Sequence, residues 1–148
     1  MPKKQAILFE VIQDLILAFV INTAATILNG GFTDTWVYLI GMFEAFSINY
    51  VAGVAIPVPA TGRKVADLIC GKKEKENFIH FFIRVFVTNA IFVTIISFTI
   101  ALINVGPHVE VFGIWWKTYW ILHLVGLITS LLTEKGCIAL ATTWLNKE

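Results

Sequence analysis

The sequence predicts an all-α integral membrane protein with four transmembrane helices in a bundle. Of the 148 residues, 57% are hydrophobic and 14% are charged, whereas about a quarter of the residues in soluble domains are charged. The mean hydropathy is +0.79. Four apolar segments each reach the roughly 20 residues that a membrane-spanning helix needs. We therefore expect residues 1–148 to form a single membrane domain.

The first two spans are expected at residues 5–28 and 36–56. No charged leader with a cleavage site precedes the first apolar segment, so we expect it to be a retained helix. Asn29-Gly30-Gly31 ends the first span, and Pro57-Val58-Pro59 interrupts the second. Residues 61–70 should continue beyond the prolines as an amphipathic cytoplasmic segment.

The third and fourth spans are expected at residues 78–104 and 114–132. The charged loop 71–76 precedes the third span, and Gly106-Pro107 follows it. The fourth helix should run past Glu134 to about residue 147, outside the membrane.

The chain resembles a tandem duplication of a helix pair, with repeats at about 5–70 and about 76–147. A shift of 75 residues places Asn29-Gly30-Gly31 on Asn104-Val105-Gly106. Trp36 at the start of the second span has counterparts in Trp115 and Trp116. Two pairs in the same orientation would be related by an axis along the membrane normal.

Basic residues predict that both termini are cytoplasmic, because Lys and Arg in short loops are retained on that side. They flank the expected cytoplasmic ends: Lys3, Lys4, Arg63, Lys64, Lys72, Lys73, Lys75, Lys135 and Lys147. Lys117 is the exception, at the edge of the fourth span. The net charge of +1 favours neither a nucleic-acid partner nor an acidic substrate. We expect a multi-pass protein of the bacterial inner membrane, in contact with lipid.

Ionisable residues predict a polar cluster in the cytoplasmic third of the bundle. His80 and Arg84 share one face of the third span, and Glu10 and Asp14 share one face of the first at a similar depth. Each unpaired charge inside a bilayer costs about 2.5 to 3.5 kcal/mol. We therefore expect Arg84 to pair with Asp14 or Glu10, with His80 as a further donor.

A second polar cluster is expected nearer the outer surface. Glu44 and His123 each lie about eight residues inside their spans, and Asn22 reaches a similar level from the other side. Asn49 falls closer to the midplane. A carboxyl group beside an imidazole at this depth could carry a proton. The full set of expected solute- or proton-binding residues is Glu10, Asp14, Asn22, Glu44, Asn49, His80, Arg84 and His123.

The same residues have a purely structural interpretation, in which buried polar groups hydrogen-bond neighbouring helices and support assembly alone. A stripe of small residues, Gly41, Ala45 and Gly53, permits two alternatives as well. It allows close packing within one chain or contact between two copies in a homo-oligomer.

Signals for an enzyme or a cofactor are weak. No nucleophile stands in sequence with a base and an orienting acid, and we expect neither a metal nor another cofactor. Cys70 and Cys137 fall on the reducing cytoplasmic side, where a disulfide is not favoured.

One resemblance to known proteins rests on Asn29, Gly30, Trp36, Ala45, Phe46, Pro57, Arg63 and Lys64. Residues 7–69 resemble a small bacterial two-helix membrane family known only as a domain of unknown function. Residues 84–145 resemble a degenerate second copy, without the proline and the Arg-Lys pair. The resemblance implies an inner-membrane location and no assigned activity.

A fainter resemblance involves Ala6-Ile7-Leu8-Phe9-Glu10. This segment is similar to the first helix of the proteobacterial antimicrobial compound efflux proteins, which carries an embedded Phe-Glu. The resemblance implies that Glu10 accepts a proton or a cation. Two functions then follow as hypotheses. One is proton-linked transport or efflux of a small solute, with a cation as one option, and the other is a membrane scaffold that assembles with or regulates another component.

Overall fold

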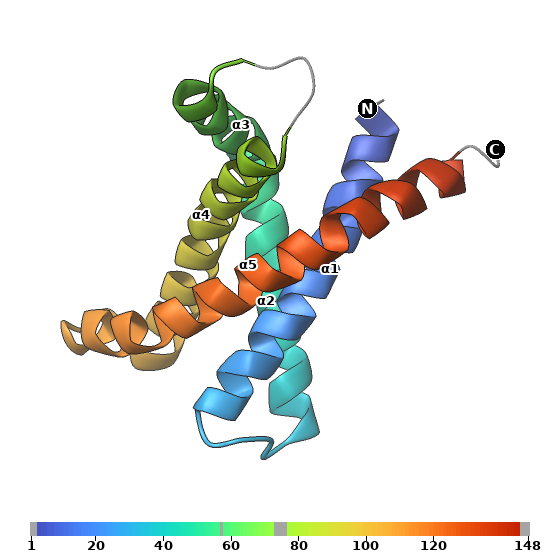
Figure 1. Ribbon diagram of the computed structural model, residues 1–148. Helices are drawn as coiled ribbons and strands as arrows, with labels where there is room; N and C mark the ends of the chain where they lie inside the picture. The colour runs from blue at the N-terminus through green and yellow to red at the C-terminus, as the bar shows by residue number, and fades with distance from the viewer. Residues whose placement is uncertain (1–2, 57, 73–76, 146–148) are drawn as a thin grey trace.

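The computed structural model describes residues 3–56, 58–72 and 77–145 of the chain. These residues form five helices and no strand: α1 (Lys3–Leu28), α2 (Thr35–Ala55), α3 (Val58–Cys70), α4 (Phe78–Val105) and α5 (Glu110–Leu145) (Figure 1). Four of them, α1, α2, α4 and α5, are long and apolar enough to cross a membrane. The expected class, an all-α membrane protein with four candidate spans, is confirmed.

Each of the four long helices packs against two of the others. The neighbours of α1 are α2 and α5, and the neighbours of α4 are α2 and α5, with α3 packed on the outside of α4. Both chain ends and α3 lie toward one end of the molecule, here called the terminal end (Figure 1). The α1–α2 and α4–α5 connections lie toward the other, here called the loop end.

Local sequence signals set the ends of the first two helices. Gly30 and Gly31 have φ values of 108° and 92°, a region that costs glycine little. The Gly31 amide donates to Thr26 O at 3.0 Å, which satisfies a carbonyl at the end of α1. Asp34 then caps α2, because its Oδ1 accepts from the Trp36 amide at 2.6 Å.

The break between α2 and α3 falls where the prolines predict it. Ile56, which precedes Pro57, is extended with φ −123° and ψ 128°, as expected before a proline. Pro57 itself, the charged segment 73–76 and Lys147 lie outside the described residues. The expected amphipathic segment is present as α3, which begins three residues earlier than the expected residue 61.

The second half of the chain contains two long helices. Asn77 caps α4 by accepting from the His80 amide at 2.9 Å, so the first turn of α4 places His80. Gly106, with φ 83°, ends α4 at Val105. The α5 helix begins at Glu110 rather than 114 and continues without a break to Leu145.

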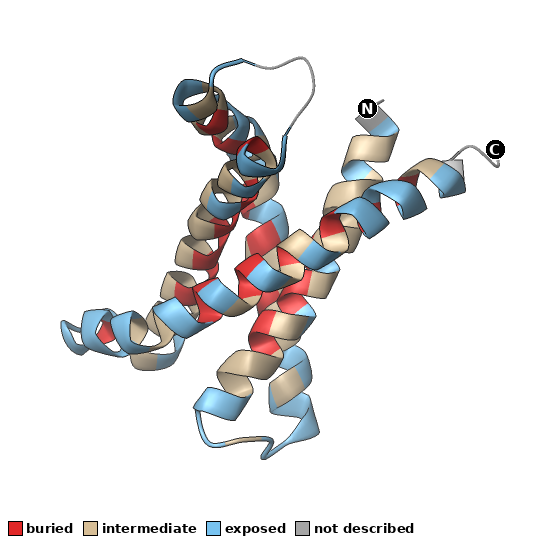
Figure 2. Ribbon diagram, viewed as in Figure 1, coloured by how far each residue is buried: buried red, intermediate tan, exposed pale blue. Residues whose placement is uncertain are grey.

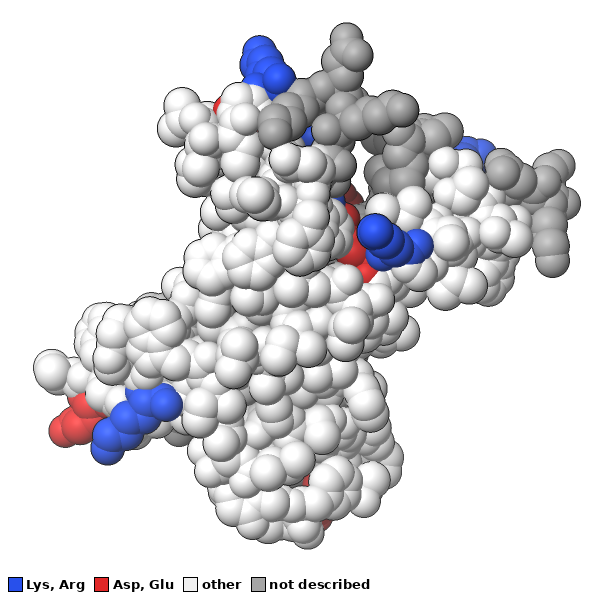
Figure 3. Space-filling model, in the orientation of Figure 1, with Lys and Arg blue, Asp and Glu red and all other residues white. Residues whose placement is uncertain are grey.

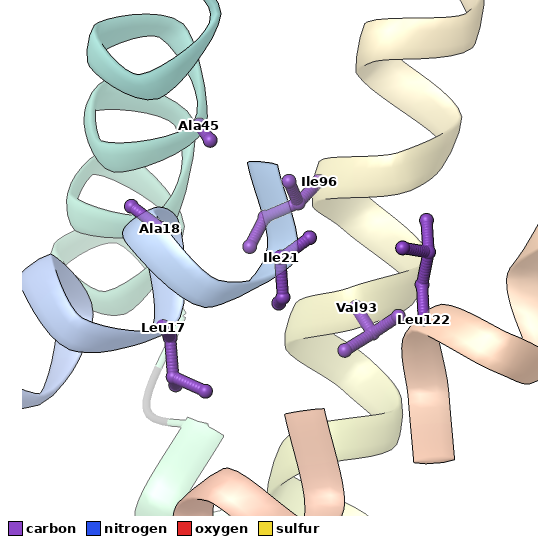
Figure 4. Close-up of a cluster of buried hydrophobic side chains, with 7 residues drawn as sticks. All are labelled: Leu17, Ala18, Ile21, Ala45, Val93, Ile96 and Leu122. Atoms are coloured by element: carbon purple, nitrogen blue, oxygen red, sulfur yellow. The ribbon is translucent and has the colours of Figure 1, made fainter. Parts of the chain in front are cut away.

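The apolar core lies where all four long helices meet. It consists of Leu17, Ala18 and Ile21 from α1, Ala45 from α2, Val93 and Ile96 from α4, and Leu122 from α5 (Figure 4). Buried residues follow the inner helix faces, and the outer faces are exposed (Figure 2). Large apolar side chains on those outer faces, such as Phe43 and Leu132, suit contact with lipid tails.

The small-residue stripe of α2 is used for packing inside the chain. An added Cβ at Gly41 would lie 2.7 Å from Asn22 Oδ1 of α1, and Ala45 is fully buried. A Cβ at Gly53 would contact Phe92 of α4. Two copies that associated through these residues would have to displace α1 and α4. The fold does not support a homo-oligomer through this surface, and the homo-oligomer itself stays a prediction.

Candidate functional site

A cavity of about 60 Å³ with a mostly apolar surface lies between the helices on the terminal side of the core. It is lined by Phe9, Glu10, Gln13, Asp14 and Leu17 of α1, Gly53 of α2, Pro59 of α3, Arg84, Val85, Thr88, Asn89 and Phe92 of α4, and Ser130 and Glu134 of α5. Three of the eight residues expected to form the site, Glu10, Asp14 and Arg84, therefore line one cavity.

Asp14 is the most enclosed acid of the cavity. Its residue is 5% exposed, and Asn49 of α2 donates to its Oδ1 at 2.7 Å. Glu10, one turn earlier on the same helix face, is half-buried. The expected inward orientation of this face is confirmed, because Ala18 and Asn22, at the next two positions of the period-four line, are buried as well.

Arg84 is paired with Glu134 of α5. Its Nη2 lies 2.6 Å from Glu134 Oε1, and both side chains are largely buried. The pairing of Arg84 with Glu10 or Asp14 stays a prediction. The α4 helix packs directly against α5, which brings Glu134 next to Arg84.

His80 is bound from the other side of α4, by α3. Its Nε2 lies 2.8 Å from Asp67 Oδ1. Phe81, the next residue, has the Arg84 guanidinium at 5.3 Å and the Lys135 ammonium at 5.8 Å from its ring centroid, within the range of a cation–π contact. His80 is thus a link between α3 and α4 and does not line the cavity.

The second expected cluster does not form. The His123 imidazole lies 3.1 Å from Asn89 Nδ2, and the same nitrogen donates to His123 O at 3.0 Å. Glu44 is on α2, whose neighbours are α1 and α4, whereas His123 is on α5. Two residues at similar depth can meet only if their helices are neighbours, and α2 and α5 are not. The expected Glu44–His123 pairing is therefore wrong.

Asn22 serves a packing role at the α1–α2 contact. Its Nδ2 donates to Tyr38 O at 3.0 Å, and its Oδ1 is close to Gly41. Of the two further amides, Asn49 supports the cavity through Asp14, and Asn22 does not reach it.

Four buried side-chain oxygens have no hydrogen-bond partner among the described residues: Gln13 Oε1, Asn49 Oδ1, Thr88 Oγ1 and Asn89 Oδ1. Three of these residues, Gln13, Thr88 and Asn89, line the cavity. Buried polar atoms without a partner are rare in folded proteins. Two of these oxygens lie at helix crossings, Thr88 Oγ1 against Gly62 of α3 and Asn89 Oδ1 against Gly126 of α5.

Glu134 and Ser130 are the main cavity residues that sequence reasoning missed. Glu134 lies beyond residue 132, where the fourth span was expected to end. The sequence did contain a signal for this face of α5, because small and polar residues recur there at a regular spacing. His123, Gly126, Ser130, Glu134, Cys137 and Ala141 recur every three or four positions, and all are buried. That line marks the inner face of α5 and continues well beyond the expected end of the span.

The cavity is reached from the terminal end. In the space-filling view, acidic side chains lie in a hollow between α3 and α4 on one side and the ends of α1 and α5 on the other (Figure 3). Toward the loop end, the apolar core follows directly, because Leu17 belongs to both the cavity wall and the core. The core thus closes the cavity on that side.

The charge balance of the cavity is negative. It contains three carboxyl groups and one guanidinium, and the guanidinium is paired with Glu134. The arrangement suits a proton or another small cation.

Comparisons with protein-family models, curated proteins and solved structures gave no match.

Proposed function

We propose that this chain is an inner-membrane protein that transports a small cationic solute in exchange for protons. The cavity is the binding site, Asp14 and Glu10 are the exchanging acids, and Arg84 with Glu134 forms a fixed part of the wall. The termini and α3 face the cytoplasm, so the cavity opens to that side.

One observation carries this proposal: Asp14 is buried, and a neutral amide, that of Asn49, donates to its carboxyl group. An ionised carboxylate buried without a counter-charge costs several kcal/mol. Two states avoid that cost, one with a proton on the carboxyl group and one with a cation bound beside it. Exchange between these two states is the elementary step of a proton–cation antiporter.

The position of the apolar core supports an alternating-access mechanism. A site open to one side and closed by packed side chains on the other is one of the two states that alternating access requires. Separation of the core residues around Ile96 and Leu122 would open the cavity toward the loop end.

The orientation rests on the basic residues. Among the described residues, Lys4, Arg63, Lys64, Lys72 and Lys135 belong to the terminal end, and Lys117 belongs to the loop end. Retention of Lys and Arg on the cytoplasmic side assigns the terminal end to the cytoplasm.

The test is proton release by the purified, detergent-solubilised protein in weak buffer. Methylammonium, guanidinium, choline and tetramethylammonium are added in turn, and the pH change is recorded. The native protein should release a proton when one of these cations binds. Asp14→Asn should abolish the release, and Glu10→Gln should reduce it.

Glu44→Gln is the matched control, because it removes a carboxyl group from α2 that does not line the cavity. It should release protons as the native protein does. Equal release by the native protein and Asp14→Asn, or no release with any of the cations, would contradict the proposed function.

A second candidate, an interaction module without transport, is favoured by α3. Leu68 and Ile69 at its end are 85% and 63% exposed, on a helix at the terminal end that packs mainly against α4. Under this alternative, neither the native protein nor Asp14→Asn releases protons when a cation is added. Asp14→Asn lowers only the free energy of unfolding.

A further inference from the structure

The α3 helix is packed on one side and open on the other. Its packed side contains Val58, Gly62 and Ala66, which are buried and recur every four residues. Asp67, the single acid of this helix, faces α4, where its Oδ1 lies 2.8 Å from His80 Nε2. The outward side of α3 is therefore left with basic groups as its only charges.

The outward side of α3 combines these basic groups with apolar side chains. Arg63 and Lys64 are exposed, and neither forms an ion pair with another described residue. Leu68 lies one turn after Lys64 on the same side of the helix and is 85% exposed, and Ile69 is 63% exposed. A ligand for this surface has to offer negative charge and apolar surface together.

The contacts with α4 fix the level of this surface. Gly62 lies against the Arg84 carbonyl oxygen, and five residues later Asp67 lies against His80. The two helices therefore run antiparallel, and the last two turns of α3 lie beside the first two turns of α4.

The first turns of α4 mark the edge of the lipid-facing surface. Phe78 and Ile79 are 76% and 60% exposed, so we expect lipid tails to contact α4 from its first turn. The phosphate groups of a bilayer lie directly beyond the tails. Lysine and arginine side chains at this level reach the phosphates while their methylene groups stay on apolar surface.

We propose that the outward side of α3 is a docking surface for the headgroups of anionic phospholipids in the surrounding membrane. Arg63 and Lys64 bind the headgroup phosphates, and Leu68 and Ile69 lie against the outermost part of the acyl chains. Amphipathic helices at membrane surfaces use the same combination of charge and apolar area. The proposal is independent of transport, because α3 contributes only Pro59 to the cavity wall.

The position of α3 favours lipid over an acidic protein as the occupant. Leu68 and Ile69 lie at the level of Phe78 and Ile79, where the membrane already supplies lipid. A protein partner would have to displace that lipid before it could cover the same side chains. An anionic phospholipid satisfies both the charge and the apolar surface in place.

The experiment is hydrogen exchange with mass spectrometry on the full chain in lipid nanodiscs. One preparation contains phosphatidylcholine alone, and the other contains equal parts of phosphatidylcholine and phosphatidylglycerol. Amide exchange in α3 should be slower in the mixed nanodiscs by about fivefold or more, since each basic residue at an anionic surface contributes about that factor in affinity. Exchange in the buried part of α1 around Ala18 should be the same in both.

Two double variants test the basic residues. Arg63→Gln with Lys64→Gln should remove the difference between the two nanodiscs and should exchange as the native protein does in phosphatidylcholine, which shows that α3 is still folded. Arg63→Lys with Lys64→Arg keeps both charges and should keep the difference. Lys117→Gln, which removes an exposed basic residue at the loop end, should keep it as well.

Inorganic phosphate separates a lipid from a free anion. Added to the phosphatidylcholine nanodiscs, it should leave the exchange of α3 unchanged, because it brings no apolar surface for Leu68 and Ile69. Slower exchange with inorganic phosphate would overturn the proposal in favour of a soluble phosphate ligand.

Two further results would overturn the proposal. Equal exchange of α3 in the two nanodiscs by the native protein would exclude a preference for anionic lipid and would assign the outward side of α3 to a protein partner. A difference that persists in Arg63→Gln with Lys64→Gln would show that these two residues do not bind the headgroups.

Discussion

At the scale of single residues, polar contacts at the terminal end join different helices. Asp14 of α1 is bound by Asn49 of α2, and Arg84 of α4 is bound by Glu134 of α5. His80 of α4 is bound by Asp67 of α3. Such contacts between helices in a membrane contribute about 0.6 kcal/mol each on average, so their main effect is to fix which faces meet.

The Arg84–Glu134 ion pair gives the first prediction. Glu134→Leu leaves the Arg84 charge without this partner and should lower the free energy of unfolding by about 3 kcal/mol. The double variant Arg84→Met with Glu134→Leu should recover most of that loss, because it removes the unpaired charge as well. Thermal unfolding in detergent, followed by circular dichroism, measures both.

Glu44→Leu is the control for this prediction, because no hydrogen bond or ion pair involves Glu44 in the described part of the chain. It should change the stability by less than about 0.5 kcal/mol. A double variant as unstable as Glu134→Leu alone would show that lost packing, rather than the unpaired charge, causes the effect.

Residue patterns predicted burial well and partners poorly. The period-four line through Asp14 and Asn22 depends only on helix geometry, and both are buried as expected. Glu134 was not expected as a partner of Arg84, because the periodicity of a helix does not show which helices are adjacent. The Glu44–His123 expectation failed for the same reason.

At the scale of the helices, close crossings occur at glycine. A Cβ added to Gly62 of α3 would lie 2.8 Å from the Arg84 carbonyl oxygen and would also clash with Thr88 Oγ1. A Cβ on Gly126 of α5 would lie 2.6 Å from Asn89 Oδ1. Both crossings involve α4 residues that line the cavity, so helix packing and the site are coupled.

Gly62→Ala should displace α3 from α4, because the carbonyl oxygen it meets belongs to a helix backbone that cannot move aside. We expect faster amide hydrogen exchange throughout α3, and a loss of stability despite the roughly 1 kcal/mol by which alanine favours a helix over glycine. Hydrogen exchange with mass spectrometry resolves the change by segment.

The matched control is Gly136→Ala in α5, where an added Cβ meets no atom within 4 Å. It should stabilise the protein by up to about 1 kcal/mol through helix propensity alone. Unchanged exchange of α3 in Gly62→Ala would contradict the close crossing.

Helix boundaries were predictable where glycine, proline or a capping residue determines them. Gly30, Gly106 and Pro57 placed three of the breaks. The limit of the fourth span at the terminal end was not predictable in this way, because α5 has no such break near residue 132 and continues to Leu145. Glu134 was missed for that reason.

At the scale of the whole molecule, the apolar core separates the cavity from the loop end. Ile96 is fully buried at the centre of this layer. Replacement of Ile96 by alanine leaves a void in it and costs about 2 kcal/mol or more of packing. We expect Ile96→Ala to increase proton leak across vesicles that contain the protein and an internal pH-sensitive dye.

Ile103→Ala is the control, because Ile103 lies on the same helix and is 56% exposed. It should leak no faster than the native protein. Equal leak in Ile96→Ala and Ile103→Ala would show that the core is not the barrier.

The orientation of the chain gives the last prediction. Cys70 ends α3 at the terminal end and is partly accessible, whereas Cys137 is buried. In a Cys137→Ser background, a membrane-impermeant maleimide should label Cys70 in inverted membrane vesicles and not in intact spheroplasts, since the terminal end is assigned to the cytoplasm. Labelling in intact spheroplasts would reverse the orientation.

The length of α5 has a mechanical consequence. Its 36 residues span about 54 Å, far more than the roughly 30 Å of a hydrocarbon layer, and it crosses the molecule obliquely (Figure 1). The helix is continuous, so its C-terminal turns act as a lever arm whose near end carries Glu134. A protein or lipid headgroup that pulls on those turns would strain the contact between Glu134 and Arg84. A force applied outside the membrane would therefore change the shape of the cavity.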